Sequence, residues 1–328
     1  MEKKLDIKKL VSQNSIWLVL ILMVVVMTFL SKSFLTIDNI TNMLITEAII
    51  GILCMGVFWT ILSKGIDLSP GAVVAFAGGI AASLAQLSTF ADRKYPNLPQ
   101  LPVILIVIIA LAIGTIFGLV NGLLIAYTGI PPFIATLGTQ LIARAFTYIY
   151  NNSYPISQLT PEFKSLGQGK IFGFIPMTVF FFVIIVIISG FMLTQTRFGK
   201  NVYAIGGNDQ AARVAGINVE KNLVKIYVWS ALCASIGGVL LVARSGAGTA
   251  TLGLNYELDA IAAATVGGTS HTGGVARISG IIAGILILGI LKNGMLLLGI
   301  NAYWQQAFKG LIIIAAVVFD MRKNRKKV

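Results

Sequence analysis

A few ionisable side chains interrupt the long apolar runs of this sequence, and they have the clearest chemical potential. They are Glu47, Asp67, Arg144, Glu257 and Asp259. Charged groups are costly inside a bilayer, so these residues are candidates to line a polar pathway or to relay protons. The alternatives are mutual pairing and the capping of helix ends. Capping is favoured for Asp67, because the following Ser69-Pro70-Gly71 is typical of a helix start. It stays open for Glu257 and Asp259, whereas Glu47 and Arg144 have no local capping role.

Motifs for catalysis are missing from the sequence. The glycine-rich stretch 267–274 has no lysine that could meet a phosphate, so it is not a nucleotide-binding loop. His271 is the only histidine, and no spacing of Cys and His is typical of a metal site. We therefore expect no catalysis, no cofactor and no metal on this chain. If the protein uses ATP, another subunit must bind it.

The stretch 197–222 separates two apolar runs and is too polar to cross a bilayer. Gly206-Gly207-Asn208 is typical of a turn, and Asn208 or Asp209 could cap the residues that follow. We expect a short helix over 210–215 that is closed by Gly216. Such a helix between two membrane segments is either a docking site for a partner or a solvated loop, and the local pattern favours neither.

The composition is that of a membrane protein. Of the 328 residues, 56% are hydrophobic and only 11% are charged, whereas soluble domains carry about 25% charged residues. The net charge is +13, but its positive side chains gather at the ends of apolar runs. They do not form the clustered surface that neutralises nucleic-acid phosphates, so nucleic acid is excluded as a partner. Cys54 and Cys233 lie inside predicted spans and are expected to be apolar filler, not a disulfide.

The sequence predicts an all-α, polytopic protein in a lipid bilayer, with a single domain over 1–328. A helix needs about 20 apolar residues to cross the hydrocarbon core. On that basis ten spans are expected, near 16–32, 40–62, 71–90, 101–127, 132–150, 172–195, 223–243, 255–268, 278–296 and 303–320. A short helix is expected near 161–166. Glycines four residues apart, at 114, 118 and 122 and at 280 and 284, predict close helix packing, mostly within the chain.

Two runs of small residues hint at an internal duplication. Asp67-Leu68-Ser69 opens one that ends in Gly78-Gly79, and Leu258-Asp259 opens another that ends in Gly267-Gly268. Interrupted helices in repeated halves are common in transporters, where the pathway lies between the halves.

Lysine and arginine residues set the predicted orientation. Ten spans place both termini on one side, and that side collects most of the positive residues, among them Lys3, Lys4, Lys8, Lys9, Arg322, Lys323, Arg325, Lys326 and Lys327. The positive-inside rule then places both termini and the stretch 197–222 in the cytoplasm. The basic start before an apolar run is similar to a signal peptide, but no small-residue cleavage site follows. We expect an uncleaved first helix.

Several motifs, in their order along the chain, resemble the permease subunits of bacterial ribose/galactose-type ABC sugar importers. They are Gly65-Ile66-Asp67-Leu68-Ser69 with Gly71, then TGIPPFIATLGT at 128–139, then Arg197-Phe198-Gly199, IGGN at 205–208, Ala211-Ala212 and Gly216-Ile217. The resemblance covers nearly the whole chain. YELDAIAA at 256–263 and NAYWQQ at 301–306 are most similar to the galactose/methylgalactoside branch.

The resemblance implies an architecture and a set of partners. It implies about ten transmembrane helices in a vitamin-B12-importer-like (type II) permease of the bacterial cytoplasmic (inner) membrane. It also implies a homodimer, an ABC ATPase subunit that binds ATP and Mg, and an extracytoplasmic sugar-binding protein. Residues 208–217 would then form the coupling helix that the ATPase holds. The coupling residues would be Gly206, Gly207, Asn208, Ala211, Ala212, Arg213 and Gly216.

The same resemblance implies a pathway that binds sugar weakly, because the soluble receptor supplies the affinity. This expectation argues against a strong sugar-binding role for Glu47 or Arg144. The candidate pathway residues are Glu47, Asp67, Ser69, Thr136, Thr139, Arg144, Glu257, Asp259, Tyr303 and Trp304. Tyr303 and Trp304 could instead belong to an aromatic belt at the membrane interface. Lys292 and Lys309 are expected to reach along their helices to an interface.

Two other functions are compatible with the sequence. One is a proton-coupled sugar symporter with Glu47, Asp67 or Glu257 as proton carrier. The other is a structural or receptor-like membrane protein. The organised stretch 197–222 favours the ABC permease over both. The sequence does not fix the sugar: galactose, methylgalactoside or glucose is expected first, with ribose, another pentose or a furanose as the alternative.

Overall fold

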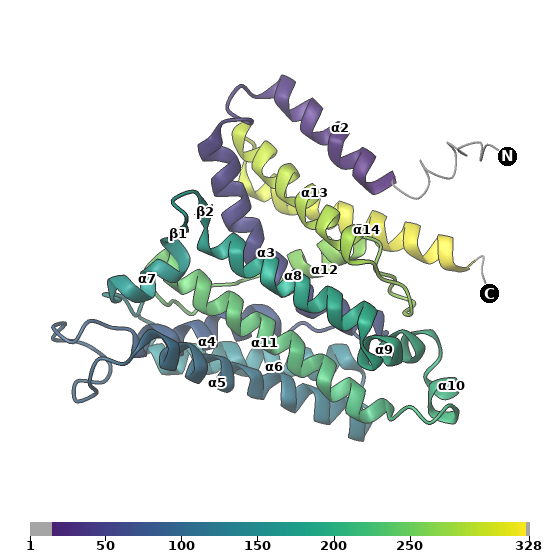
Figure 1. Ribbon diagram of the computed structural model, residues 1–328, viewed down its shortest axis with the longest axis horizontal. Coiled ribbons are helices and arrows are strands. Elements are labelled where there is room, and N and C mark those ends of the chain that lie inside the picture. The colour runs from purple at the N-terminus through teal and green to yellow at the C-terminus, as the bar shows by residue number, and fades with distance from the viewer. Residues whose placement is uncertain (1–14, 326–328) are drawn as a thin grey trace.

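The computed structural model describes residues 15–325, which fold into helices joined mostly by short loops (Figure 1). The lysines at 3, 4, 8, 9, 326 and 327, used above to predict the orientation, lie outside the described residues. The helices are α2 (Ser15–Leu30), α3 (Ile37–Leu62), α4 (Pro70–Leu84), α5 (Val103–Leu123), α6 (Pro132–Asn151), α7 (Pro161–Gln168), α8 (Met177–Gln195), α9 (Arg197–Gly207), α10 (Asp209–Val214), α11 (Val219–Ser245), α12 (Tyr256–Val266), α13 (Ile278–Leu297) and α14 (Ala302–Arg325). A π-helical turn, η1 (Leu124–Thr128), continues α5, and strands β1 (Lys170–Ile171) and β2 (Ile175–Pro176) form an antiparallel hairpin before α8.

Proline and glycine set several helix boundaries. Pro70, Pro132 and Pro161 stand in the first turns of α4, α6 and α7, where the missing backbone N–H has no helical partner to lose. Gly129 stops η1 in a left-handed conformation with φ +72°, which glycine adopts at no steric cost. These residues give the chain its sharp reversals between helices.

Six of the described helices are long and apolar enough to cross a bilayer by length and composition. They are 37–62, 103–128, 177–195, 219–245, 278–297 and 302–322, and two shorter apolar helices cover 16–30 and 70–84. The helices α6 and α12 do not meet these criteria. α6 carries Gln140 and Arg144 in its middle, and α12 has only 11 residues.

Two of the predicted spans were misplaced at their ends. The span expected over 71–90 ends at Leu84, because Gln86 and Leu87 pair with the backbone of residues 158–159 and leave the helix. The span expected over 172–195 begins only at Met177, because the preceding residues form the β1–β2 hairpin. The short helix expected near 161–166 is confirmed as α7.

Helix α11 lies at the centre of the fold and contacts α3, α4, α5 and α7. The contact with α5 runs along the predicted glycine row. A Cβ at Gly114 would lie 2.1 Å from Ser235 Oγ, and one at Gly118 would lie 2.3 Å from the Tyr227 carbonyl oxygen. These glycines therefore bring two backbones of the same chain together, as predicted. The second half of α3 is buried on all sides, which is typical of a helix surrounded by others.

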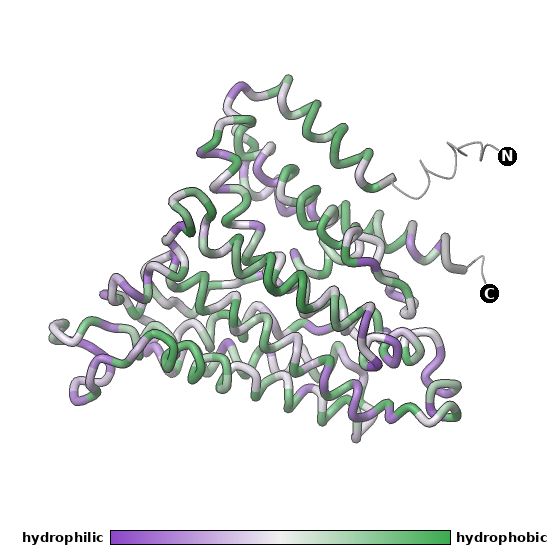
Figure 2. The backbone as a smooth tube through the Cα atoms, in the orientation of Figure 1, coloured by the Kyte–Doolittle hydropathy of each residue, from purple (hydrophilic) through white to green (hydrophobic). Residues whose placement is uncertain are grey.

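The bundle has two polar ends. The segment α9–α10, the start of α2 and the end of α14 lie at one end, on the right in Figure 1. The long loop after α4 and the helix α7 lie at the other. Figure 2 shows hydrophilic residues gathered mainly at these two ends, with hydrophobic helices between them. This distribution is the one expected of a protein that crosses a bilayer along this direction.

Two short helices, α4 and α12, begin inside the bundle and run in opposite directions. Each follows a long helix and a non-helical stretch: 63–69 before α4 and 246–255 before α12. Their first turns meet, since a Cβ at Gly71 would overlap the Glu257 carboxylate. From there α4 runs towards α7, where Ala85 accepts the N–H of Thr160, and α12 runs towards the loop beside α9. The two small-residue runs noted in the sequence thus lie in these two short helices, and an internal duplication stays a prediction.

Candidate functional site

Helix α9 is held against the end of α3 by a junction of glycines. A Cβ on Gly206 would lie 1.9 Å from the Leu62 carbonyl oxygen and 2.5 Å from the Gly274 nitrogen. The Gly274 N–H donates to that same carbonyl at 3.0 Å, and Lys64 Nζ donates to the Gly207 carbonyl at 3.1 Å. The end of α9, the end of α3 and the loop 267–277 therefore meet with backbone against backbone. The sequence predicted a turn at this position but not the helix α9 before it.

Helix α9 is also bonded to the start of α13. Val202 and Ile205 turn its apolar side inward, and the Tyr203 hydroxyl donates to the Ala276 carbonyl at 2.7 Å. Burial raises the pKa of Tyr203, which keeps its hydroxyl protonated as the donor of this bond.

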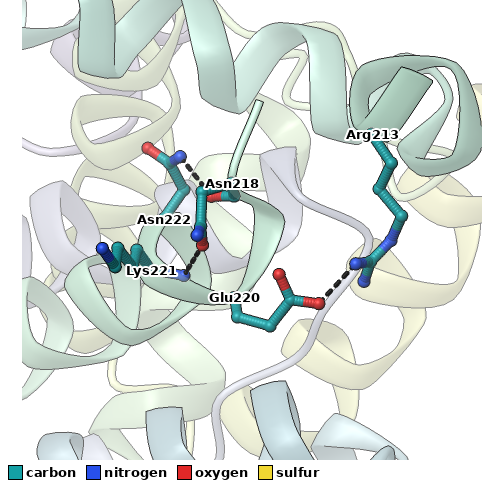
Figure 3. Close-up of polar contacts among 5 residues, drawn as sticks. All are labelled: Arg213, Asn218, Glu220, Lys221 and Asn222. Atoms are coloured by element: carbon teal, nitrogen blue, oxygen red, sulfur yellow. Dashed lines mark hydrogen bonds and ion pairs between the residues drawn. The ribbon is translucent and has the colours of Figure 1, made fainter. Parts of the chain in front are cut away.

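The short helix predicted over 210–215 is confirmed as α10, one residue earlier. Asn208 caps it, with Oδ1 accepting the Ala211 N–H at 3.0 Å, and Gly216 follows with φ +82°. Figure 3 shows Arg213 paired with Glu220 of α11, so α10 is tied back to the next long helix. In the same view Asn218 caps α11 and accepts the Lys221 N–H at 2.8 Å.

The residues of α10 divide into an inner and an outer set. Ala212 is buried among Ile205 and Val219, so it packs α10 onto the bundle. Facing outward, Gly207, Ala211 and Gly216 are exposed, and Val214 is 92% exposed. The sequence reasoning missed Val214; its signal was an apolar side chain within a polar loop helix. Of the predicted coupling residues, Gly206 and Ala212 therefore serve internal packing, while the exposed ones are free to meet a partner.

A buried polar network surrounds the start of α4. The Asp67 carboxylate accepts from the Ser69 hydroxyl and from the Ser230 hydroxyl, each at 2.7 Å. Asn121 donates to the Ser69 hydroxyl at 3.0 Å, and Thr139 donates to Asn121 at 2.7 Å. The Asp67 carboxylate also accepts the Ser69 N–H at 2.9 Å. Ser69, and not Asp67, is the residue that directly precedes α4, so Asp67 does not cap this helix.

This network fixes four helices to one another. Asp67 is fully buried, and Thr136 and Thr139 are buried with it. Thr136 donates to the carbonyl of Ile66 at 3.1 Å. The four predicted pathway residues Asp67, Ser69, Thr136 and Thr139 thus hold α4, α5, α6 and α11 in register, and a role in the pathway stays a prediction for them.

Arg144 holds the two interrupted segments together. Its guanidinium donates to the carbonyls of Ala250 and Leu252 in the stretch before α12, and to the carbonyl of Gly71 in α4 at 3.0 Å. One helical turn away, Gln140 donates to Glu257 Oε1 at 2.9 Å. The long-range pairing considered for Arg144 is therefore observed, and its partners are backbone carbonyls.

A cavity of about 250 Å³, lined by both charged and apolar side chains, lies between α3, α12, α13 and α14. Glu47 and Asp259, both predicted pathway residues, line it, and so do Lys292 and Lys309. Lys309 Nζ lies 2.6 Å from Asp259 Oδ1. The Lys309 ammonium is thus paired with a carboxylate of α12, with 26% of its side chain exposed, and its reach to a membrane interface stays a prediction. Lys292 is exposed at the cavity and interacts electrostatically with Glu47.

The aromatic pair at the start of α14 lies on the surface. Tyr303 is 80% exposed and Trp304 is 64% exposed, with the Trp304 ring 6.3 Å from that of Phe308. An aromatic belt and a pathway mouth both fit this position, so the prediction for these two residues stays open.

Comparison with known proteins shows which family this chain resembles. Residues 39–317 match the family model described as branched-chain amino acid transport system / permease component. The galactose/methyl galactoside import permease protein MglC of Haemophilus influenzae is 39% identical, over 97% of this chain and 96% of that protein. The Escherichia coli K12 protein of the same name is 38% identical, over 96% of each chain. The ribose import permease protein RbsC of Escherichia coli K12 is also 38% identical, over 96% of this chain and 95% of that one. No solved structure matches significantly.

Proposed function

The chain belongs to the family described as branched-chain amino acid transport system / permease component, and on that premise we propose that it is the membrane-spanning permease of an ATP-driven sugar importer. The family description names amino acids, whereas the full-length relatives are named for galactose and ribose. Galactose or methylgalactoside is therefore the proposed solute, and ribose is the alternative. The chain itself is not an enzyme; ATP and Mg bind to a separate ABC ATPase, and a sugar-binding protein delivers the sugar from outside.

The observation that carries the proposal is the outward surface of α10. Val214 is 92% exposed at a polar end of the bundle, beside the exposed Gly207 and Ala211. An apolar side chain held out on a capped, ion-paired helix gains from burial against another protein. We assign this surface to the ATPase, with α10 as the coupling helix. Movement of α10 would then pass through α9 and the glycine junction to α3 and to the loop that ends α12.

The proposed architecture is the type II permease with ten crossings and both termini in the cytoplasm of a bacterial cell. Support comes from the start of α2 and the end of α14, which lie at the same end as α10 (Figure 1). α14 supports the proposed homodimer, since its apolar span has no residues buried within the chain. A second copy that covers it would bury a surface otherwise left to lipid.

Uptake of labelled galactose into proteoliposomes tests the proposed function. The full chain is reconstituted with and without its ATPase, its binding protein and internal ATP. We expect uptake only when all three are present, and competition by unlabelled sugars then identifies the solute. Uptake by this chain alone, driven by a proton gradient, would instead establish a symporter and would refute the proposal.

Substitutions in α10 test the docking surface. Val214→Asp is expected to reduce copurification of the ATPase and ATP-driven uptake, while thermal stability stays unchanged because the side chain is exposed. Ala212→Asp is the matched comparison. It places a charge among Ile205 and Val219, so it should reduce docking and also destabilise α10. Copurification and uptake that are both unaffected by Val214→Asp would contradict the coupling role.

A further inference from the structure

The cavity between α3, α12, α13 and α14 lies in the half of the bundle away from α10. Its residues come from the last turns of α13 and the first turns of α14, such as Met295 and Ala302. The start of α13 lies beside α9, where Tyr203 bonds to Ala276, so the end of α13 lies at the opposite side. Under the proposed orientation this is the side from which a binding protein delivers its sugar. A solute entering the permease would therefore meet this cavity early in its passage.

The charged side chains that line this cavity make contact with lipid chains unfavourable. Glu47, Asp259, Lys292 and Lys309 all line it, and three of the four helices that carry them, α3, α13 and α14, are long and apolar enough to cross a bilayer. Ionisable side chains at such positions face the bundle interior or a water-filled space, because their burial in hydrocarbon is costly. The cavity therefore faces a water-filled space, and a polar solute can reach it.

Among the described residues that line the cavity, Glu47 has carboxyl oxygens that accept no hydrogen bond. Only 6% of it is exposed, and within residues 15–325 no side chain lies at bonding distance from its carboxylate to form a hydrogen bond or an ion pair. Lys292 interacts with it electrostatically. A buried carboxyl group is costly to leave without hydrogen-bond partners. A solute that brings hydroxyl groups into the cavity would supply them.

The remaining lining shows what kind of solute fits. Two carboxylates and two ammonium groups line the cavity, so their formal charges cancel and neither a cation nor an anion is favoured. Gln305 and Gln306 offer amides that both donate and accept, and Ile50 and Leu288 offer apolar surface. A volume of about 250 Å³ is just below the usual range for drug-sized ligands. The match is a small, neutral solute with many hydroxyl groups and apolar C–H faces.

We propose that this cavity is a sugar-binding station in each permease subunit, where Glu47 accepts hydrogen bonds from sugar hydroxyls. The proposal rests on the proposed function, which makes a monosaccharide the solute. It makes Glu47 a hydrogen-bond acceptor for sugar, in contrast to the expectation that the pathway has no strong polar contact for sugar. Affinity at the station is low, because the neighbouring charges are already partly paired and the binding protein supplies tight capture.

Protection of an introduced cysteine tests occupancy without any need for transport. Ala302→Cys places a thiol on the exposed rim of the cavity, and the native Cys54 and Cys233 are fully buried. The full-length variant in lipid nanodiscs is labelled with a maleimide while D-galactose or D-ribose is titrated. Sugar is expected to slow labelling of the introduced thiol several-fold, and glycine betaine at the same osmolarity is expected to have no effect. Asn97→Cys, in the exposed loop after α4, is the matched control and should label at the same rate throughout.

Substitution of Glu47 in the Ala302→Cys background tests its role. Glu47→Leu should raise the sugar concentration for half-protection about two- to tenfold, as expected on losing a hydrogen bond. Glu47→Gln should raise it less, since an amide oxygen still accepts. Glu162→Leu, on the exposed face of α7, is the control and should leave the concentration unchanged. A Glu47→Leu curve that coincides with this control would overturn the role of Glu47.

The outcomes for the station and for the proposed function are separable. Unchanged labelling at saturating sugar, with intact ATP-dependent uptake, overturns the station and leaves the importer standing. Equal protection by glycine betaine also overturns it, because the effect is then not specific to sugar. Sugar-specific protection without ATP-dependent uptake supports the station and refutes the importer.

Discussion

The two adjacent glycines at the end of α9 provide a matched test of the glycine junction. An added methyl group in a helix normally stabilises it by about 0.5–1 kcal/mol relative to glycine. At Gly206 the new Cβ would lie 1.9 Å from the Leu62 carbonyl oxygen, whereas ordinary contact begins at 3.4 Å. The end of α9 must therefore move by about 1.5 Å, the difference between those distances. At Gly207 the new Cβ meets nothing within 4 Å.

These distances set the expected magnitudes. Forcing extra volume into a packed contact costs about 1–3 kcal/mol, and more where backbone atoms must move. After subtraction of the helix gain, we expect Gly206→Ala to destabilise the protein by about 1–2 kcal/mol. Gly207→Ala should lie within about 0.5 kcal/mol of the parent protein, as for other surface changes. Both variants add the same single carbon, so the difference between them reports only the junction.

Thermal unfolding of the purified variants in nanodiscs, with hydrogen exchange of α9 amides, measures the effect. Gly206→Ala should lower the unfolding temperature and speed exchange in α9, and it should reduce ATP-driven uptake while ATPase copurification persists. Gly207→Ala should leave the unfolding temperature and the exchange of α9 amides unchanged, because its new Cβ meets nothing within 4 Å. If the two variants unfold at the same temperature, α9 is not held by this junction and the proposed route from α10 to α3 is refuted.

Three further predictions concern charged groups. Removing either partner of the Asp259–Lys309 pair should cost about 2 kcal/mol, less than a fully buried pair, because 16% and 26% of these side chains remain exposed. The double neutral variant should recover much of that loss. If the two single losses in unfolding temperature simply add up in the double variant, the pairing is contradicted. Arg144→Lys should lower stability by about 1–3 kcal/mol, because a single ammonium cannot reach three carbonyls as the planar guanidinium does; an unchanged unfolding temperature would speak against this clamp. Burial lowers the pKa of His271, and the Asp320 charge partly opposes this effect. The unfolded state then binds a proton more readily, so stability should be full above about pH 6.5 and should fall as the pH drops below it. His271→Gln should remove that part of the dependence, which unfolding temperatures between about pH 5 and 8 would measure.

Hydropathy and glycine spacing anticipated much of the helical architecture. Each predicted span contains a helix, and the Gly114/Gly118 row packs against α11 as expected. Both features depend on residues near one another in sequence. The misplaced ends depend on partners far away: residues beyond Leu84 leave α4 because the Leu87 N–H donates to the Gln158 carbonyl and the Thr160 N–H donates to the Ala85 carbonyl. No local pattern contains that information.

The candidate site was anticipated in part for the same reason. The cap and the stop of α10 are local, and the sequence predicted both. The division of its residues into an inner and an outer set depends on Ile205 and Val219, so it could not be predicted. Glu47 and Asp259 were identified because they are charged at membrane depth, but their meeting with Lys309 depends on the fold. Val214 was missed because an apolar residue in a loop helix indicates a docking surface only when the fold shows that it is exposed.

The brevity of α12 has a consequence for how the protein is made. Its 11 residues span about 16 Å as a helix, roughly half of the ~30 Å hydrocarbon core. A segment of that length cannot enter the membrane as an independent span during synthesis. It must wait until earlier-made helices can receive it, as α3 does where Cys54 Sγ donates to the Ala260 carbonyl at 3.3 Å. The wall of the cavity that carries Tyr256 and Asp259 is thus completed only after the helices that receive α12 have been inserted.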